Sequence, residues 1–220
     1  MEYNIGDDLC RVSLYFDLPK RYNYIEGGVF QFGAEQDNDI VWGVGRSVKT
    51  PKDFTNKNNK AKLYSCRDKV SDMKFVPCPS VFHRLVDMPV GKDEILILGG
   101  SDTIGRRVSD IPNVTMNLKE YAAIFASASS VITNSYHTAY WSLLSGRKIK
   151  LLGYSSKFSD LFKIFDLDTS LIREYDKGDF DSFKSAVSQL KIIPWVSVNS
   201  SYKDRFRSLN NEFYNTVKTL

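Results

Sequence analysis

The sequence predicts an α/β fold with two Rossmann-like lobes, each a parallel sheet flanked by helices. In the second half of the chain, short β-branched and apolar runs alternate with helix-length amphipathic segments, which favours a parallel sheet with right-handed crossovers. The 220 residues are 42% apolar and 13% aromatic, enough for real hydrophobic cores. The Pro- and Gly-containing stretch VDMPVGKDE then predicts a linker between an abbreviated N-terminal lobe, residues 1–88, and a C-terminal lobe, residues 89–220.

Small βα pieces fill the predicted N-terminal lobe. GDDLCRVSLYFDLP predicts a helix that Asp7 or Asp8 caps and that Pro19 ends. The stretches DIVWGVG, at residues 39–45, and LYSCRD predict strands, and the polar stretch TPKDFTNKNNKAK predicts a loop. DMKFVPCPSVF predicts an extended piece that its two prolines interrupt.

The C-terminal lobe shows the clearest alternation. Strands are expected at 95–98, 130–133 and 149–152, with a further short strand in NVTM, residues 113–116. Asn117, with Glu120 three positions on, predicts the start of the helix LKEYAAIFASAS. The last two amphipathic helices, at 180–190 and 202–220, are expected to close this lobe.

Composition narrows the function classes. The net charge of +4 is spread along the chain in short basic patches, which is not typical of a nucleic-acid-binding surface. No apolar run approaches the roughly 20 residues of a membrane span, and the acidic N-terminus does not resemble a signal peptide, so we expect a cytoplasmic protein. Cys10, Cys66 and Cys78 lack C-x-x-C spacing, so we expect reduced packing residues without chemistry and no metal site.

One histidine lies where a predicted strand passes into a helix, in VITNSYHTAYWSLLSGRKIKLLGY. The carboxyl ends of parallel strands share one edge of the sheet, so His137 is expected there with other polar residues. The imidazole, the free N–H groups of the helix start and its dipole suit a phosphate or carboxylate. On position alone, an inert His137 bonded to backbone is an equal alternative. The other expected donor-binding residues at this edge are Arg106, Arg107, Asn134, Ser135, Ser155 and Lys157. Arg147 and Lys148 are expected at the opposite edge.

Other signals are weaker. LGGSDTIG matches neither common glycine-rich phosphate loop and favours a tight turn. The triplets at 37–39 and 166–168 have the D-x-D form of some metal sites, but such triplets are frequent in polar loops. His83 has no partner nearby in sequence and is expected to be structural. No G-x-S-x-G, H-E-x-x-H or cysteine–histidine pairing is apparent, which argues against the hydrolases most easily identified from sequence.

Several of these pieces resemble, in order, the motifs of the polysaccharide pyruvyltransferase family. NIGDDL is similar to its N-x-G-D-[DE]-L opening, YIEGGVFQFG and DIVWGVG to its glycine-serine and W-G-x-G strands, and SCRDKVS to its R-D-x-x-S element. FVPCPSVF is similar to its P-D-P-x-[FL] segment and NSYHTAYWSLLSGRKI to its histidine-containing block. The sequence departs from the family in Cys78, which replaces an aspartate, in Tyr136 and in the short N-terminal half.

The resemblance implies a GT-B-like enzyme that transfers pyruvate from phosphoenolpyruvate to sugar hydroxyls as a ketal, without any other cofactor. His137 would bind the donor and act as general acid, and Asp7 or Asp8 would accept a proton from the sugar, unless they merely cap a helix. Gly6 and Arg46 are expected on the side of the acceptor, a saccharide or a lipid-linked glycan. Two alternatives stay open: a glycosyltransferase that uses a nucleotide sugar, and a non-catalytic carbohydrate-binding or assembly protein. An oligomer is compatible with each of these three functions.

Overall fold

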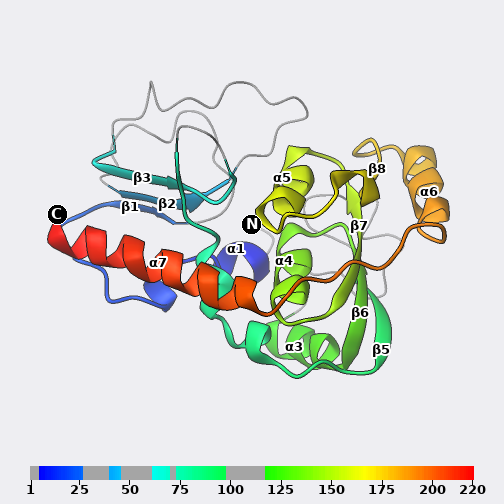
Figure 1. The fold of residues 1–220 in the computed structure, drawn as a ribbon, viewed down its shortest axis with the longest axis horizontal. Helices are drawn as coiled ribbons and strands as arrows, with labels where there is room; N and C mark the ends of the chain where they lie inside the picture. The colour runs from blue at the N-terminus through cyan, green and yellow to red at the C-terminus, as the bar shows by residue number, and fades with distance from the viewer. Residues whose placement is uncertain (1–4, 27–39, 46–60, 70–72, 98–116) are drawn as a thin grey trace.

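The computed structural model describes residues 5–26, 40–45, 61–69, 73–97 and 117–220 (Figure 1). The strands in these residues form two parallel four-stranded sheets flanked by helices, which confirms the predicted α/β fold with Rossmann-like sheets. In this part of the chain, no helix combines the length and apolar character needed to cross a membrane.

The first sheet has its strands in chain order. They are β1 (Tyr24–Glu26), β2 (Ile40–Val44), β3 (Leu63–Cys66) and β4 (Lys74–Phe75). All three neighbouring pairs are parallel. The central strand β2 is buried along its whole length, as its continuous apolar run predicts. Both strand predictions for this region are confirmed, whereas residues 50–60 of the predicted polar loop lie outside the described residues.

The second sheet also keeps chain order. Its strands are β5 (Asp93–Ile97), β6 (Ala128–Thr133), β7 (Lys148–Gly153) and β8 (Arg173–Glu174). The helices between and after them are α3 (Leu118–Ser127), α4 (Tyr136–Leu144), α5 (Ser156–Ile164), the 3-10 turn η5 (Thr169–Leu171) and α6 (Phe180–Gln189). The predicted parallel pairing of β5, β6 and β7 is confirmed. The side chain of Asn117 caps α3, as predicted, by accepting a 3.0 Å hydrogen bond from the backbone N–H of Glu120. The predicted strand 113–116 lies outside the described residues.

The predicted first helix is wrong in its length. Only Ile5–Asp8 form the α-helix α1, and a separate 3-10 turn, η1 (Val12–Leu14), follows after an extended Arg11. The reason is the destination of the side chains: Leu9 and Cys10 pack into the core under the second sheet, whereas Val12 packs into a separate core beside Trp42 of the first. Leu9 and Val12 are three positions apart and would share one face of a continuous helix, so the backbone turns between them to reach the two cores. Asp7 and Asp8 consequently lie within α1 and do not precede it as caps.

The connection between the sheets is held in place. It contains two 3-10 turns, η3 (Pro79–Phe82) and η4 (Arg84–Asp87), before β5 begins. The buried guanidinium of Arg147 donates to the carbonyls of Met88 and Pro89, at 3.4 and 2.7 Å, and also to those of Phe125 and Ala128. Arg147 therefore lies at the amino edge of the second sheet, as predicted, and ties the linker to that lobe.

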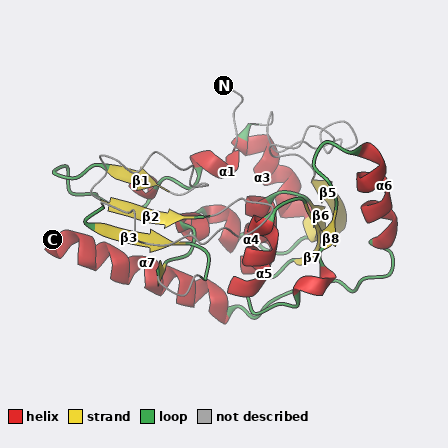
Figure 2. Cartoon of the chain, turned by 90° about the horizontal axis from the view of Figure 1, so that it is seen from above, coloured by secondary structure: helices red, strands yellow, loops and turns green. Residues whose placement is uncertain are grey.

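The last helix departs from the predicted division of the chain. α7 (Ser201–Thr219) begins against the core of the second sheet through Phe206 and ends against the first, where Phe213 and Val217 pack beside Trp42. Figure 1 shows it running from the second lobe back across the first, and Figure 2 shows the same path from above. Thus α6 packs on β8 as expected, but α7 does not close the C-terminal lobe alone and instead braces both lobes.

Candidate functional site

His137 lies in the first turn of α4, directly after the turn that connects β6 to this helix, as predicted. The cap of this helix is Ser135, whose hydroxyl accepts a 3.4 Å hydrogen bond from the N–H of Thr138. The imidazole is 7% exposed and stacks on Trp141 of the next turn, with ring centroids 5.6 Å apart. Figure 1 shows α1 beside α4 at the junction of the two lobes, and the imidazole of His137 lies against Gly6 of α1.

Two cysteines contact this histidine, which corrects the prediction that no cysteine–histidine pairing exists, while all three cysteines are free and buried, as predicted. The sulfur of Cys10 lies 2.8 Å from Nε2 of His137 and 3.5 Å from the sulfur of Cys78. Cys78 lies 3.8 Å from the same nitrogen and 3.1 Å from the hydroxyl of Ser80. All three groups are buried, and they come from parts of the chain that sequence spacing does not connect.

The protonation of this cluster follows from its contacts. The Cys10 thiol donates to the carbonyl of Gly6 at 2.9 Å, so its sulfur is left to accept from Nε2–H of His137. Burial alone would raise the pKa of the Cys78 thiol. The effect of burial is outweighed by the hydrogen bonds of Cys78 with Cys10 and His137 and by the nearby positive charges of His137 and Arg67. Together they hold the pKa of Cys78 well below its usual value.

Gly6, predicted on the acceptor side, contacts the histidine itself. A Cβ atom at this position would overlap Nδ1 of His137, so only glycine allows α1 to lie this close to the imidazole. The close approach explains a glycine inside a short helix, where it otherwise lowers stability.

The structure adds a site residue that sequence reasoning missed, Arg67, directly after β3. Its guanidinium is 1% exposed and stacks on the ring of Tyr136, with Cζ 3.9 Å from the ring centroid. Burial favours a lower pKa, but Tyr136 and Asp68 outweigh it and keep Arg67 charged. Its Nε and Nη1, and the hydroxyl of Tyr136, have no hydrogen-bond partner among the described residues. The RD of SCRDKVS, noted for its resemblance, was the signal that could have identified it.

Unpaired donors on two touching buried side chains are unusual, because an unsatisfied buried group costs roughly 1–3 kcal/mol, and more when it is charged. The pKa of Tyr136 is raised well above its usual value, first by burial, so its hydroxyl remains a proton donor. The adjoining groups thus offer a cation and three N–H or O–H donors. That donor set is suited to a carboxylate or a phosphate.

A separate pocket of about 320 Å³ opens at the carboxyl edge of β7 and β8. It is lined by the N-terminal turn of α5, including Ser155, and by Tyr175 and Asp176 after β8. Asn134, in the same turn as His137, donates a 3.0 Å hydrogen bond to the hydroxyl of Tyr175, which links the pocket to that turn. Lys157 donates to the hydroxyl of Tyr154, another residue of the lining, at 2.9 Å. The predicted carboxyl-edge residues Asn134, Ser135, Ser155 and Lys157 are therefore brought to one side of the second sheet.

Several predicted residues are not placed with this cluster. Asp7 is exposed, and Asp8 forms a 3.0 Å ion pair with Arg11, so no contact with His137 supports either as a base. Arg46, Arg106, Arg107 and the triplet at 37–39 lie outside the described residues.

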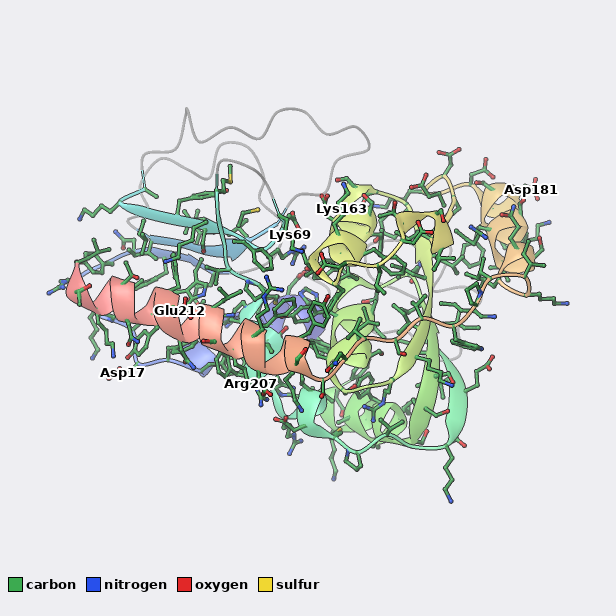
Figure 3. The ribbon with its side chains drawn as sticks, in the orientation of Figure 1. Asp17, Lys69, Lys163, Asp181, Arg207 and Glu212 are labelled. Atoms are coloured by element: carbon green, nitrogen blue, oxygen red, sulfur yellow. The ribbon has the colours of Figure 1, made fainter. Side chains whose placement is uncertain are left out.

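Two weaker signals have structural roles. His83 caps η4 by accepting from the N–H of Leu85, as expected for a structural histidine. In the other D-x-D triplet, Asp166 binds Lys69 and Tyr202, and Asp168 caps η5. Lys69 and Asp166 are 97 residues apart, and Figure 3 shows Lys69 at the side of the first lobe that faces α5.

Comparisons of the chain with protein-family models, with curated proteins and with solved structures found no match.

Proposed function

We propose that this protein is a polysaccharide pyruvyltransferase-like enzyme with a GT-B-like arrangement of its lobes. It moves pyruvate from phosphoenolpyruvate to two hydroxyls of a saccharide, as a ketal, in surface polysaccharide or glycan biosynthesis. The observation that carries the proposal is the buried Arg67 guanidinium with unpaired N–H groups, stacked on Tyr136 beside His137. Phosphoenolpyruvate carries a carboxylate and a phosphate, and either group would satisfy these donors.

The reaction assigns a task to each group. A proton from the general acid adds to the methylene carbon of the enol phosphate, a sugar hydroxyl adds to the adjacent carbon, phosphate leaves, and a second hydroxyl closes the ketal. Each hydroxyl gives up its proton: one leaves on the phosphate, and the other restores the general acid. His137 supplies the proton, because the contact of its Nε2 with the Cys10 sulfur, which itself donates to the carbonyl of Gly6, requires a proton on that nitrogen. Arg67 and the start of α4 hold the anionic groups, and Arg67 offsets the negative charge that grows on the leaving phosphate.

A second candidate, a glycosyltransferase that uses a nucleotide sugar, is favoured by the pocket beside α5. A space of about 320 Å³ next to a helix start and two tyrosines suits a nucleotide better than it suits a three-carbon acid. This pocket does not include Arg67, so the two candidate donors are assigned to different residues.

The test is a binding measurement with both donors. Phosphoenolpyruvate should raise the melting temperature of the wild type and not that of Arg67→Met, and with a glycan acceptor it should release phosphate. The matched control, Ser155→Ala, alters the pocket beside α5 and should leave the effect of phosphoenolpyruvate unchanged. Stabilisation by nucleotide sugars alone, abolished by a larger side chain at Ser155, would contradict the pyruvyltransferase and support the second candidate.

A further inference from the structure

Cys10, Cys78 and His137 form a cluster that the proposed reaction does not fully use. Pyruvyl transfer requires a proton on the histidine, but it does not require two thiols in contact with the same nitrogen. The three ligand atoms are the two sulfurs and Nε2, and the separations are 3.5, 2.8 and 3.8 Å. Cys10 and Cys78 are 0% exposed and His137 is 7% exposed, so packing in the core fixes their positions relative to one another.

These separations fit a small tetrahedral metal centre. Zinc bonds of about 2.3 Å to sulfur and about 2.05 Å to nitrogen, at tetrahedral angles, place two sulfurs about 3.8 Å apart and sulfur and nitrogen about 3.6 Å apart. The sulfur–sulfur distance and that from Cys78 to the histidine agree within about 0.3 Å of these values. Only the hydrogen-bonded contact from Cys10 to the histidine must lengthen, by about 0.8 Å.

The local charge also permits a cation, although Arg67 is close. A divalent ion held by two thiolates and a neutral imidazole displaces two protons from the cluster in all, so the net charge of the cluster stays the same. Arg67 therefore meets no added charge when the exchange takes place. Two sulfurs and an imidazole select thiophilic ions such as Zn²⁺ over Mg²⁺ or Ca²⁺, and three protein ligands leave the fourth position open.

We propose that Cys10, Cys78 and Nε2 of His137 bind one thiophilic divalent cation, with Zn²⁺ as the expected class. The histidine must then carry its proton on Nδ1, which faces Gly6, instead of on Nε2. A bound metal and a proton on Nε2 exclude each other. If His137 is the general acid of the proposed function, and this consequence alone rests on that function, the metal inhibits transfer and a chelator restores it.

The binding test uses Co²⁺ as a probe and no substrate. Reduced wild-type protein should take up one equivalent, with a sulfur-to-cobalt charge-transfer band and the intense visible bands of tetrahedral Co²⁺, and Zn²⁺ should displace it. Cys10→Ser and Cys78→Ser should each lose most of the charge-transfer intensity. Cys66→Ser is the matched control, because Cys66 is also buried but lies outside the cluster, and it should bind like the wild type.

A second measurement keeps the proposal testable if a serine variant fails to fold. Calorimetric titration of the wild type in buffers of different ionisation enthalpy should show proton release on binding, with affinity that falls as pH falls. No cobalt uptake by the reduced wild type, or equal charge-transfer bands in wild type and both cluster variants, would overturn the site. Because neither measurement involves phosphoenolpyruvate, a failed transfer assay leaves these results unaffected, and a failed metal titration leaves the proposed function standing.

Discussion

The guanidinium carbon of Arg67 lies 3.9 Å from the centre of the Tyr136 ring, and the two side chains come from different lobes. Arg67 follows β3 of the first sheet, and Tyr136 begins α4 of the second. The buried contact joins the lobes, yet the Nε and Nη1 donors of the arginine and the tyrosine hydroxyl have no partner among the described residues. An arrangement that leaves these groups unsatisfied is costly to the free protein, and an anionic ligand would remove the cost.

Arg67→Met should separate stability from donor binding. Methionine fills a similar volume without an unpaired buried charge, so the free energy of unfolding should stay equal or rise by about 1 kcal/mol, whereas stabilisation by phosphoenolpyruvate should disappear. Chemical denaturation with and without phosphoenolpyruvate measures both effects.

Arg147→Met is the control for this prediction. Arg147 is equally buried but donates to four backbone carbonyls, so its loss leaves those acceptors unsatisfied and should lower the free energy of unfolding by about 3 kcal/mol or more. If Arg67→Met were as destabilised as Arg147→Met, Arg67 would be a structural residue and not a binding one.

Gly6→Ala should damage the site through the histidine. The added methyl group would overlap Nδ1 of His137, so the imidazole must move away from Cys10 and Cys78 or α1 must shift. Turnover should fall by about 10²-fold, since small displacements of a catalytic group have effects of this size. Gly178→Ala provides the comparison: it adds strain at φ 89° in an exposed turn where a Cβ would contact nothing within 4 Å. That variant should lose roughly 1 kcal/mol of stability and keep its turnover.

Sequence reasoning succeeded where one local signal determines the structure. The strands β5, β6 and β7, the Asn117 cap and the place of His137 each follow from a short pattern of apolar or capping residues. It failed where the structure depends on distant contacts. The first predicted helix is divided because Leu9 and Val12 belong to different cores, and local periodicity contains no information about that division.

The site shows the same limit. Cys10 and His137 are 127 positions apart, and nothing in their spacing predicts a contact of 2.8 Å. Arg67 carried a signal in SCRDKVS, but its burial and its unpaired donors depend on Tyr136, from the other lobe. Residue types and short motifs could identify one partner of each pair, and only the packing of the lobes supplies the other.

Asp87→Asn should reduce stability in a pH-dependent way. Burial alone would raise the pKa of Asp87, but its bonds with Arg207 at 2.7 Å and Lys203 at 3.1 Å outweigh it and lower the pKa. A lowered folded-state pKa gives stability that is present above the unfolded value of about 3.9 and is lost as pH falls through the folded value. These half-exposed contacts of Asp87 should contribute less than about 1 kcal/mol, so wild type should melt slightly higher than the variant at pH 7 and match it only below the lowered folded-state pKa.

Ionic strength and a second carboxylate test whether Asp87 acts through its ion pairs with Arg207 and Lys203. Added salt should narrow the gap between wild type and Asp87→Asn at pH 7, because exposed charges are screened. Asp181→Asn, at an exposed position on α6 shown in Figure 3, should differ little from wild type at any pH. A gap that persists unchanged at a pH well below the folded-state pKa of Asp87 would mean that Asp87 acts through packing and not through its charge.

His137→Ala should abolish transfer while the chain still folds, whereas His83→Ala should change turnover little. His137 contacts both thiols and meets the ring of Tyr136 edge to face, and loss of a general acid lowers the rate by about 10²- to 10⁴-fold. His83 caps η4 through the N–H of Leu85, so its removal should lower stability by roughly 0.5–2 kcal/mol and spare the chemistry. Melting temperature and turnover should be measured on the same preparations of both variants. If His137→Ala were destabilised yet kept near-normal turnover, the histidine would be a packing residue between two thiols, and the proton donor would have to be another group near Arg67.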